Sequence, residues 1–357
     1  MWQSIDCGRE AIRLDDTLFT WNSNHDYTQT GTNELVRINT TRDEFNTLRA
    51  FPNNTKDNCY NVPIDAQPIR YIIRVGFYYG NYDGLSRPPT FDLFINNVKW
   101  TTVNTTINNG EPVYEEIIYY NKGSGFFKIC LAHVQDGGIP IINSIETVGV
   151  SHVLYPKMET NATYNLVTRI NFGGPEVRYD LETDEVYNRI WSKRSTPYAN
   201  VSGLPTYFAP TLENHPPGSV LANAIESNAS DPINFTIDLP QLASQSAYIV
   251  LYITKQQENS INPNQTASVK IEIDSQDQGT VHTSGYGETT VVTKYPVMVS
   301  GPTMNMTLSR ADESSLPPMI AAMEVFTKWD SDKSSAAPEF FSFAYSLIIL
   351  FMLLLVA

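Results

Sequence analysis

The chain has 357 residues, of which 41% are hydrophobic, and a formal net charge of −14 at neutral pH. This length allows two domains, and the hydrophobic content is enough to build a buried core. The negative charge, which no cluster of Lys and Arg offsets, excludes nucleic acid as a partner and disfavours polyanionic polysaccharides. Neutral sugars and basic peptides fit the charge better.

No long helical pattern occurs before residue 340, and the 22 prolines and 19 glycines are spread along the chain as frequent turn signals. Short alternating segments between such turns indicate an all-β protein. Residues 15–31 are rich in turn formers, and Tyr27 is one of their conspicuous side chains. In chain order, the first half is expected to form strands at residues 4–8, 70–79, 91–95, 98–103, 115–120, 126–132 and 139–150.

Residues 70–95 organise this first half. The odd-numbered residues from 71 to 79 are hydrophobic and share one face of the predicted strand. The turn-rich residues 81–90 cannot continue it and predict a loop. The strand should therefore bring Tyr78, Tyr79, Tyr82 and Asp83 to a loop at the edge of a sheet.

Aromatic rings beside a carboxylate suit a sugar, because the apolar C–H faces stack on the rings while the hydroxyls bond the carboxylate. Tyr27 joins the same candidate carbohydrate site. The alternative interpretation is that these tyrosines are packing residues.

Three cysteines, Cys7, Cys59 and Cys130, lack the spacing of a zinc site or of a CxxC redox pair. In a secreted protein they allow one disulfide and one leftover thiol. The sequence does not assign the pair, and our choice is Cys59–Cys130.

Nine N-x-S/T sequons without proline are spread between the hydrophobic segments, as expected of a secretory-pathway ectodomain. The predicted glycosylation sites are Asn39, Asn53, Asn104, Asn161, Asn200, Asn228, Asn234, Asn264 and Asn305. The segment after Met1 has none of the parts of a signal peptide, so we expect one to lie upstream of it.

The second half of the chain repeats the plan of the first. Residues 269–273 lie 178 positions beyond the alternating residues 91–95, and PMIAAME at 318–324 lies 178 positions beyond PIINSIE at 140–146. Because two separate matches share the same spacing of 178 residues, the sequence predicts tandem copies of one β fold. The boundary falls near residues 151–165, and the second copy's loop at residues 255–259 lacks the tyrosine cluster.

The C-terminus ends in an uncharged segment at residues 340–357. The small residues Ser334 and Ser335, a short spacer and this apolar tail have the layout of a GPI-anchor signal. The alternatives are a C-terminal membrane anchor and the start of a truncated membrane span. The predicted organisation is therefore a first domain at 1–152, a linker at 153–164, a second domain at 165–328, a polar stalk at 329–339 and the tail.

Catalytic chemistry is not predicted. The five histidines are scattered without metal-ligand spacing, and no GxSxG, HExxH or P-loop motif occurs. Glycoside hydrolysis needs only two carboxylates, and a chain with 38 acidic residues offers such pairs by chance. Glu115 and Glu116 are expected to form an exposed strand end. We expect no enzyme, metal or cofactor.

The chain resembles the malectin-like (di-glucose-binding-like) ectodomain of plant leucine-rich-repeat receptor-like kinases. The resemblance covers about residues 4–328 and departs from the family in lacking leucine-rich repeats and a kinase region. It implies two tandem β-sandwich (jelly-roll) domains on the extracellular face of the plant plasma membrane, with Tyr78, Tyr79 and Tyr82 lining a carbohydrate site. The shared segments include residues 4–8 (SIDCG), 48–52 (LRAFP), 58–60 (NCY), 71–74 (YIIR), 87–93 (RPPTFDL), 188–191 (NRIW) and 315–318 (SLPP).

The leading hypothesis is a non-catalytic cell-surface module that binds cell-wall oligosaccharide and acts with a receptor-like kinase. It would be held at the membrane by a GPI anchor or its C-terminal segment. The second hypothesis is a co-receptor module that binds a secreted basic peptide or another protein, in which the tyrosines are interface anchors.

Overall fold

The computed structural model describes residues 2–15, 19–53, 55, 57–67, 69–106, 110–151, 153–179, 184–204, 206, 209–228, 231–255, 267–283 and 289–330. Several predictions lie outside these residues: the anchor sites Ser334 and Ser335, the tail at 340–357, the sequon at Asn264 and most of the loop at 255–259. No helix in the described ranges is long and apolar enough to cross a membrane.

The first half of the chain (residues 2–151) is a sandwich of two antiparallel sheets. Hydrophobic residues from both sheets meet in one buried core, which includes Tyr71, Ile73, Phe91 and Phe127. One sheet has the order β1 (Trp2–Asp6), β13 (Ser144–Val150), β7 (Arg70–Phe77) and β10 (Val113–Tyr120). The other has the order β6 (Cys59–Pro63), β11 (Phe126–His133), β8 (Thr90–Ile95) and β9 (Val98–Asn104).

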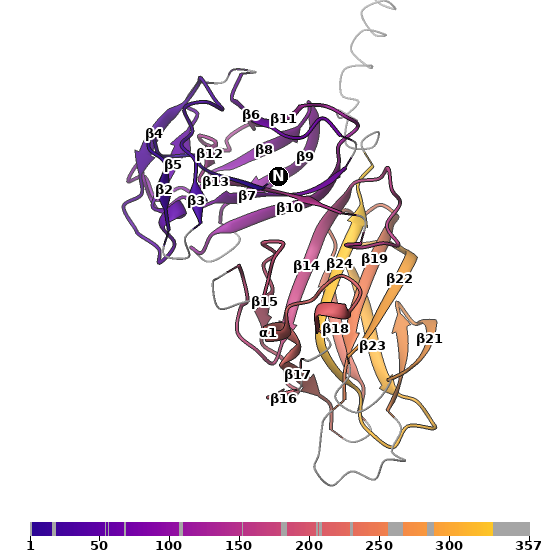
Figure 1. Ribbon diagram of the computed structural model, residues 1–357. Coiled ribbons are helices and arrows are strands. Elements are labelled where there is room, and N and C mark those ends of the chain that lie inside the picture. Colours follow the sequence, from indigo (N-terminus) through magenta and orange to yellow (C-terminus); the bar gives the residue numbers. More distant parts are fainter. Residues whose placement is uncertain are drawn as a thin grey trace, which may run out of the picture.

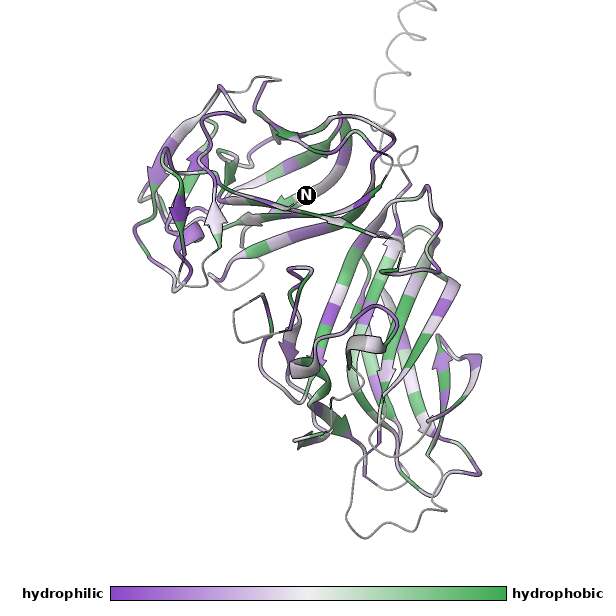
Figure 2. Ribbon diagram, viewed as in Figure 1, coloured by the Kyte–Doolittle hydropathy of each residue, from purple (hydrophilic) through white to green (hydrophobic). Residues whose placement is uncertain are grey.

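The second half (residues 153–330) repeats this arrangement strand for strand around a core of its own. Figure 2 shows bands of hydrophobic and hydrophilic residues along its long strands, as expected where one face is buried. Its first sheet has the order β14 (Tyr164–Phe172), β24 (Met319–Lys328), β19 (Gln245–Ile253) and β22 (Thr290–Val299). Its second has the order β18 (Ile233–Asp238), β23 (Thr303–Arg310), β20 (Ser268–Ile273) and β21 (Gln276–His282).

Short elements complete each half. In the first half these are β2 (Arg13–Leu14), β3 (Thr20–Trp21), β4 (Thr32–Leu35), β5 (Thr47–Ala50), β12 (Ile141–Ile142) and the 3-10 helix η1 (Asp43–Phe45). In the second half they are β15 (Ser192–Arg194), β16 (Ala199–Ser202), β17 (Asn223–Glu226), the 3-10 helix η2 (Ala209–Thr211) and α1 (Gly218–Leu221). The prediction of an all-β protein built from two tandem β-sandwich domains is confirmed.

The two halves share one continuous sheet (Figure 1). Strand β10, at the margin of the first half, pairs with β14 of the second half through Ile117 opposite Asn165 and Ile118 opposite Tyr164. A further buried cluster also spans both halves, because Ile72 and Val148 pack with residues of the second half. We call the β10–β14 pairing the seam.

Strand β7 confirms the predicted alternation. All of its residues are buried, with Tyr71, Ile73, Val75 and Phe77 in the core of the first half and Ile72 on the opposite face. The strand is flanked on both sides, by β13 and β10. The tyrosine loop therefore follows an inner strand, and the expectation of a loop at a sheet edge was wrong.

Two further expectations need correction. The predicted closing strand at 139–150 is split at Asn143, whose side chain accepts a hydrogen bond from the Tyr78 N–H (2.6 Å) and donates one to the Thr47 carbonyl (2.8 Å). Glu115 and Glu116 do not form an exposed strand end. Glu115 is half-buried, and Glu116 is buried because two arginines pair with it.

Cys59 and Cys130 lie opposite each other on β6 and β11 and form a disulfide, which is the pair chosen from the sequence. Cys7 keeps a free, buried thiol. Burial raises the pKa of this thiol well above its usual value, so it stays protonated and unreactive at neutral pH.

Candidate binding site

The loop after β7 folds back beside a second loop, and the two enclose a cavity of about 260 Å³. Gly80 has a φ of +49°, and a Cβ at this position would lie 2.5 Å from Val36, so the turn requires glycine. The cavity is lined by Tyr79, Tyr82, Asp83, Leu85, Arg87, Pro88 and Pro89 of the first loop and by residues 136–139 of the second.

Hydrogen bonds fix Tyr79 and Asp83 against each other. The Tyr79 hydroxyl donates to the Asp83 carboxylate and accepts from the Arg87 N–H (3.2 Å). Asp83 also accepts from the Leu85 N–H (3.0 Å). These bonds hold one aromatic ring and one carboxylate in a fixed geometry at the wall of the cavity.

Tyr82 is the more open of the two tyrosines in this cavity. Its ring meets that of Tyr79 edge to face with centroids 5.8 Å apart, and it is half-buried. Burial, reinforced by the negative charge of Asp83, raises the pKa of Tyr82 to about 12. Its hydroxyl therefore stays protonated and can donate to a ligand at any physiological pH.

Two of the predicted site residues do not line this cavity. Tyr78 is buried in the core, where its hydroxyl donates to the Ile38 carbonyl (3.0 Å) and its ring meets Phe45. Tyr27 is half-buried against the same core. The structure thus brings together Tyr79, Tyr82 and Asp83, whereas Tyr78 and Tyr27 take the packing role that was the alternative interpretation.

Residues 136–139 form the wall that the sequence did not reveal. Gly137 approaches β8 so closely that a Cβ would lie 2.1 Å from the Thr90 carbonyl oxygen, and its own carbonyl accepts from the Thr90 N–H (2.7 Å). This contact places the exposed Asp136 at the cavity as a second carboxylate. The contact between this segment and the tyrosine loop joins residues that are distant in sequence, so no local pattern reveals it.

A row of buried charges crosses the seam, with one member on each of five adjacent strands: Glu146 (β13), Arg74 (β7), Glu116 (β10), Arg169 (β14) and Glu324 (β24). Successive members are 2.7, 3.2, 2.9 and 2.6 Å apart. We call these five residues the charge row. Because a buried ion is stable only with its partners in place, the row fixes how the two halves meet.

The row is completed by polar groups at each end. Asn188 of the second half donates to Glu146. The hydroxyls of Tyr155 and Tyr252 donate to Glu324 at 2.5 and 2.9 Å. Burial opposes ionisation of Glu146, but Arg74 outweighs this cost and holds the pKa of Glu146 below its usual value.

A second candidate cavity, of about 300 Å³, lies between the halves. Its walls include the rings of Phe19 and Trp21 from the first half and Tyr179 from the second, together with carboxylates of Asp43 and Glu44. Arg42, Arg74 and Arg178 line the same cavity, so its charge is mixed. Burial raises the pKa of Glu44, although Arg13 lies 3.8 Å from its carboxylate.

Within the described residues, no group of three or more His, Cys, Asp or Glu side chains is placed to hold a metal ion. Of the sequon asparagines in these ranges, Asn104 is half-buried and the others are exposed. Exposure is what an attached glycan requires.

The comparisons with known proteins agree with this architecture. The model of the malectin-like domain matches residues 5–328. A leucine-rich repeat receptor-like serine/threonine-protein kinase of Arabidopsis thaliana is 29% identical over 344 residues, which cover 91% of this chain and 37% of the kinase. A second such putative kinase of the same species is 31% identical over 304 residues, covering 81% of this chain and 32% of its own length. The chain thus spans about a third of the length of these curated relatives.

Solved structures show the same fold at low sequence identity. The ANX2 ectodomain from Arabidopsis thaliana superposes with a TM-score of 0.75 at 13% identity, covering 92% of this chain and 97% of that chain. A chain from the structure of the plant peptide RALF23 in complex with FER and LLG2 gives a TM-score of 0.73 at 14% identity, covering 93% and 96%.

Proposed function

Because the chain belongs to the malectin-like family, the fold found in ectodomains of plant receptor-like kinases, we propose that it is a non-catalytic carbohydrate-binding module of the plant cell surface. In this proposal it lies on the extracellular face of the plasma membrane, contacts a neutral cell-wall oligosaccharide and acts with a receptor-like kinase. A GPI anchor or a C-terminal membrane segment holds it there.

One observation carries the proposal: the cavity that places Tyr79 and Tyr82 beside Asp83 and Asp136. Half-exposed Tyr82 offers a ring face for the apolar side of a pyranose. The carboxylates offer acceptors for its hydroxyls, and the Tyr82 hydroxyl offers a donor. The hydrogen bonds of Tyr79 to Asp83 and Arg87 order these groups before a ligand arrives, which lowers the entropy cost of binding.

A glycan array probed with the full chain tests this function. Tyr82→Ala removes the stacking surface and should weaken binding of any retained glycan about tenfold, equivalent to about 1.4 kcal/mol. Asp83→Asn should weaken it similarly, because the amide replaces an ionic acceptor by a neutral one. Tyr78→Phe, in the same loop but outside the cavity, is the matched control. Absence of glycan binding, or equal binding by Tyr82→Ala, would refute the carbohydrate site.

The alternative is a module that binds a basic peptide, and the cavity between the halves favours it. Its aromatic rings and the carboxylates of Asp43 and Glu44 are suited to a Lys or Arg side chain through cation–π and ionic contacts, while Arg42 and Arg178 in the same walls offset part of this attraction. The structure that contains RALF23 is one of a similar fold. Capture of a basic peptide that weakens with salt and with Glu44→Gln, in a chain that ignores glycans, would select this function.

A further inference from the structure

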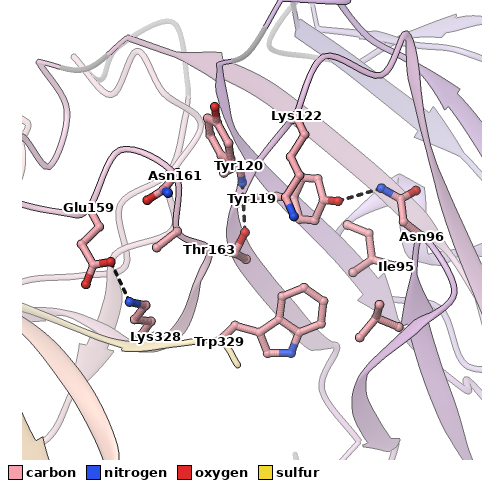
Figure 3. Close-up of a pocket in the computed structure, with 12 residues that line it drawn as sticks. Ile95, Asn96, Tyr119, Tyr120, Lys122, Glu159, Asn161, Thr163, Lys328 and Trp329 are labelled. Carbon is pink, nitrogen blue, oxygen red and sulfur yellow. Dashed lines mark hydrogen bonds and ion pairs between the residues drawn. The ribbon is translucent and has the colours of Figure 1, made fainter. Parts of the chain in front are cut away.

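A third cavity, of about 410 Å³, lies at the seam between the two halves. Its walls come from the end of β10 (Tyr119, Tyr120), from the segment before β14 (Glu159, Asn161, Thr163) and from the end of β24 (Lys328, Trp329). Figure 3 shows these side chains around one opening, with Lys122 and Asn96 on the side of the first half.

Asn161, which opens a sequon with Thr163, is itself a wall residue of this cavity. Its side chain is exposed, as an attached glycan requires. In Figure 3 it lies between Glu159 and Tyr120. The first sugar of a glycan linked to the Asn161 amide would therefore lie next to the cavity.

The segment that carries Asn161 is held on both sides. Thr163 accepts a hydrogen bond from the Tyr120 N–H (3.1 Å), and its carbonyl accepts one from the Trp329 N–H (2.8 Å). Glu159 pairs with Lys328 at 2.6 Å. These contacts fix the attachment point relative to the cavity walls, so the first sugar of the glycan has a narrow range of positions.

The walls suit an acetamido sugar. Half-buried Tyr120 and the indole of Trp329 offer apolar surface for a pyranose face. Lys122 and Lys328 supply donors, and Glu159 supplies an acceptor.

We propose that the N-glycan on Asn161 packs its first N-acetylglucosamine residues into the seam cavity and braces the two halves of the molecule. The glycan is then an internal structural element. This proposal does not depend on which external ligand the chain binds.

The first test compares the accessibility of single glycans. The full chain is produced in cells that keep N-glycans in the high-mannose form, and glycopeptide mass spectrometry follows their removal by endoglycosidase H, which cuts between the first two sugars. In the native protein, removal at Asn161 should be about tenfold slower than at exposed Asn39, and the two rates should become equal after denaturation. An unoccupied Asn161, or equal native rates, would overturn the proposal.

The second test separates packing of the glycan from its presence. Tyr120→Ala leaves the sequon intact and should raise the native rate at Asn161 to that at Asn39. The milder Lys122→Ala, at an exposed position, should raise it in part and serves if Tyr120→Ala fails to fold. Asn161→Gln should lower the midpoint of thermal unfolding, and Asn39→Gln should leave it unchanged. Unchanged protection in both cavity variants would contradict the packing.

Discussion

The two halves of the molecule use one strand order but stabilise it differently. Each places a buried glutamate at the same position of its first sheet, Glu146 on β13 and Glu324 on β24. Glu146 pairs with an arginine of the following neighbour, β7, whereas Glu324 pairs with Arg169 of the preceding neighbour, β14. Both arginines also pair with Glu116 of the first half. Arg169 of the second half therefore stabilises a glutamate in each half.

The first half also carries features of its own. All cysteines of the chain lie in the first half, and so does the aromatic loop with its cavity. Glu115 of β10 pairs with Val75, while at the equivalent register of the second half Val292 pairs with Leu251. A duplicated fold thus keeps its strand order while side chains at equivalent positions change from apolar to ionisable.

Breaking the charge row at Arg169, one of its two arginines, should have the largest effect. Arg169→Met leaves Glu116 and Glu324 buried without this partner, and should lower the free energy of unfolding by about 3–5 kcal/mol. Urea unfolding followed by tryptophan fluorescence measures this. The control is Lys193→Met, an exposed cation on β15, which should be neutral. A cost for Arg169→Met below about 1 kcal/mol would mean that the halves do not depend on the row.

Removing the disulfide should destabilise the first half without a direct effect on the second. The double variant Cys59→Ala/Cys130→Ala releases a crosslink across 71 residues and should cost the first half about 2–4 kcal/mol. Hydrogen exchange should then lose protection in β6, β8 and β11 before it does in β18, β20 and β23. Simultaneous loss in both sets would show that the halves unfold as one unit.

Glu115 should make the first half sensitive to pH. Burial raises the pKa of Glu115 from 4.5 to about 7. A raised pKa means that the folded state favours the protonated carboxyl more than the unfolded state does. The free energy of unfolding is therefore highest below pH 4.5 and falls as the pH rises through about 7. Glu115→Val, which installs the residue type of the second half, should therefore stabilise the protein by about 2 kcal/mol at pH 8 and by less at pH 5.

Urea unfolding at both pH values measures this difference. Glu10→Gln, which removes an exposed carboxylate of the first half, is the control and should have the same small effect at both pH values. An equal effect of Glu115→Val at pH 5 and pH 8 would show that ionisation of Glu115 is not the cause.

The smallest expected effect concerns the tyrosine loop. Tyr78→Phe removes one buried hydrogen bond to the Ile38 carbonyl and should cost about 1 kcal/mol. Tyr82→Ala, at the half-exposed position, should lower the free energy of unfolding by no more than Tyr78→Phe does. If Tyr78→Phe weakened ligand binding while Tyr82→Ala did not, the division of the loop into packing and binding residues would be reversed.

The alternation of hydrophobic residues predicted most strands, because a strand with one buried face shows this alternation within its own sequence. This is why β7, β8, β10, β11 and β20 lie within a few residues of their expected places. Tyr79, Tyr82 and Asp83 were found for the same reason, since the loop that brings them together is continuous in sequence.

The remaining features depend on contacts between distant segments. Glu116 was expected at the surface because an isolated carboxylate favours water, and only Arg74 and Arg169 on the adjacent strands make its burial stable. Asp136 reaches the cavity only through the contact of Gly137 with β8. Tyr78 could not be assigned to packing because its ring contacts Phe45 and its hydroxyl bonds the Ile38 carbonyl, both of which are distant in sequence.

The position of β24 has a mechanical consequence. This strand lies between β14 and β19, and the described chain continues from its end at Lys328 to Asp330. A tensile load applied beyond Asp330 would act along the axis of β24. The hydrogen bonds on both of its sides would then bear the load together in shear, instead of breaking one at a time as they do when a hairpin is peeled. Strand β1 forms a full ladder with β13 and is joined on its other side by the short bridge of Ile5 to Asn22. The same load applied at Trp2 would therefore be resisted mainly by one ladder.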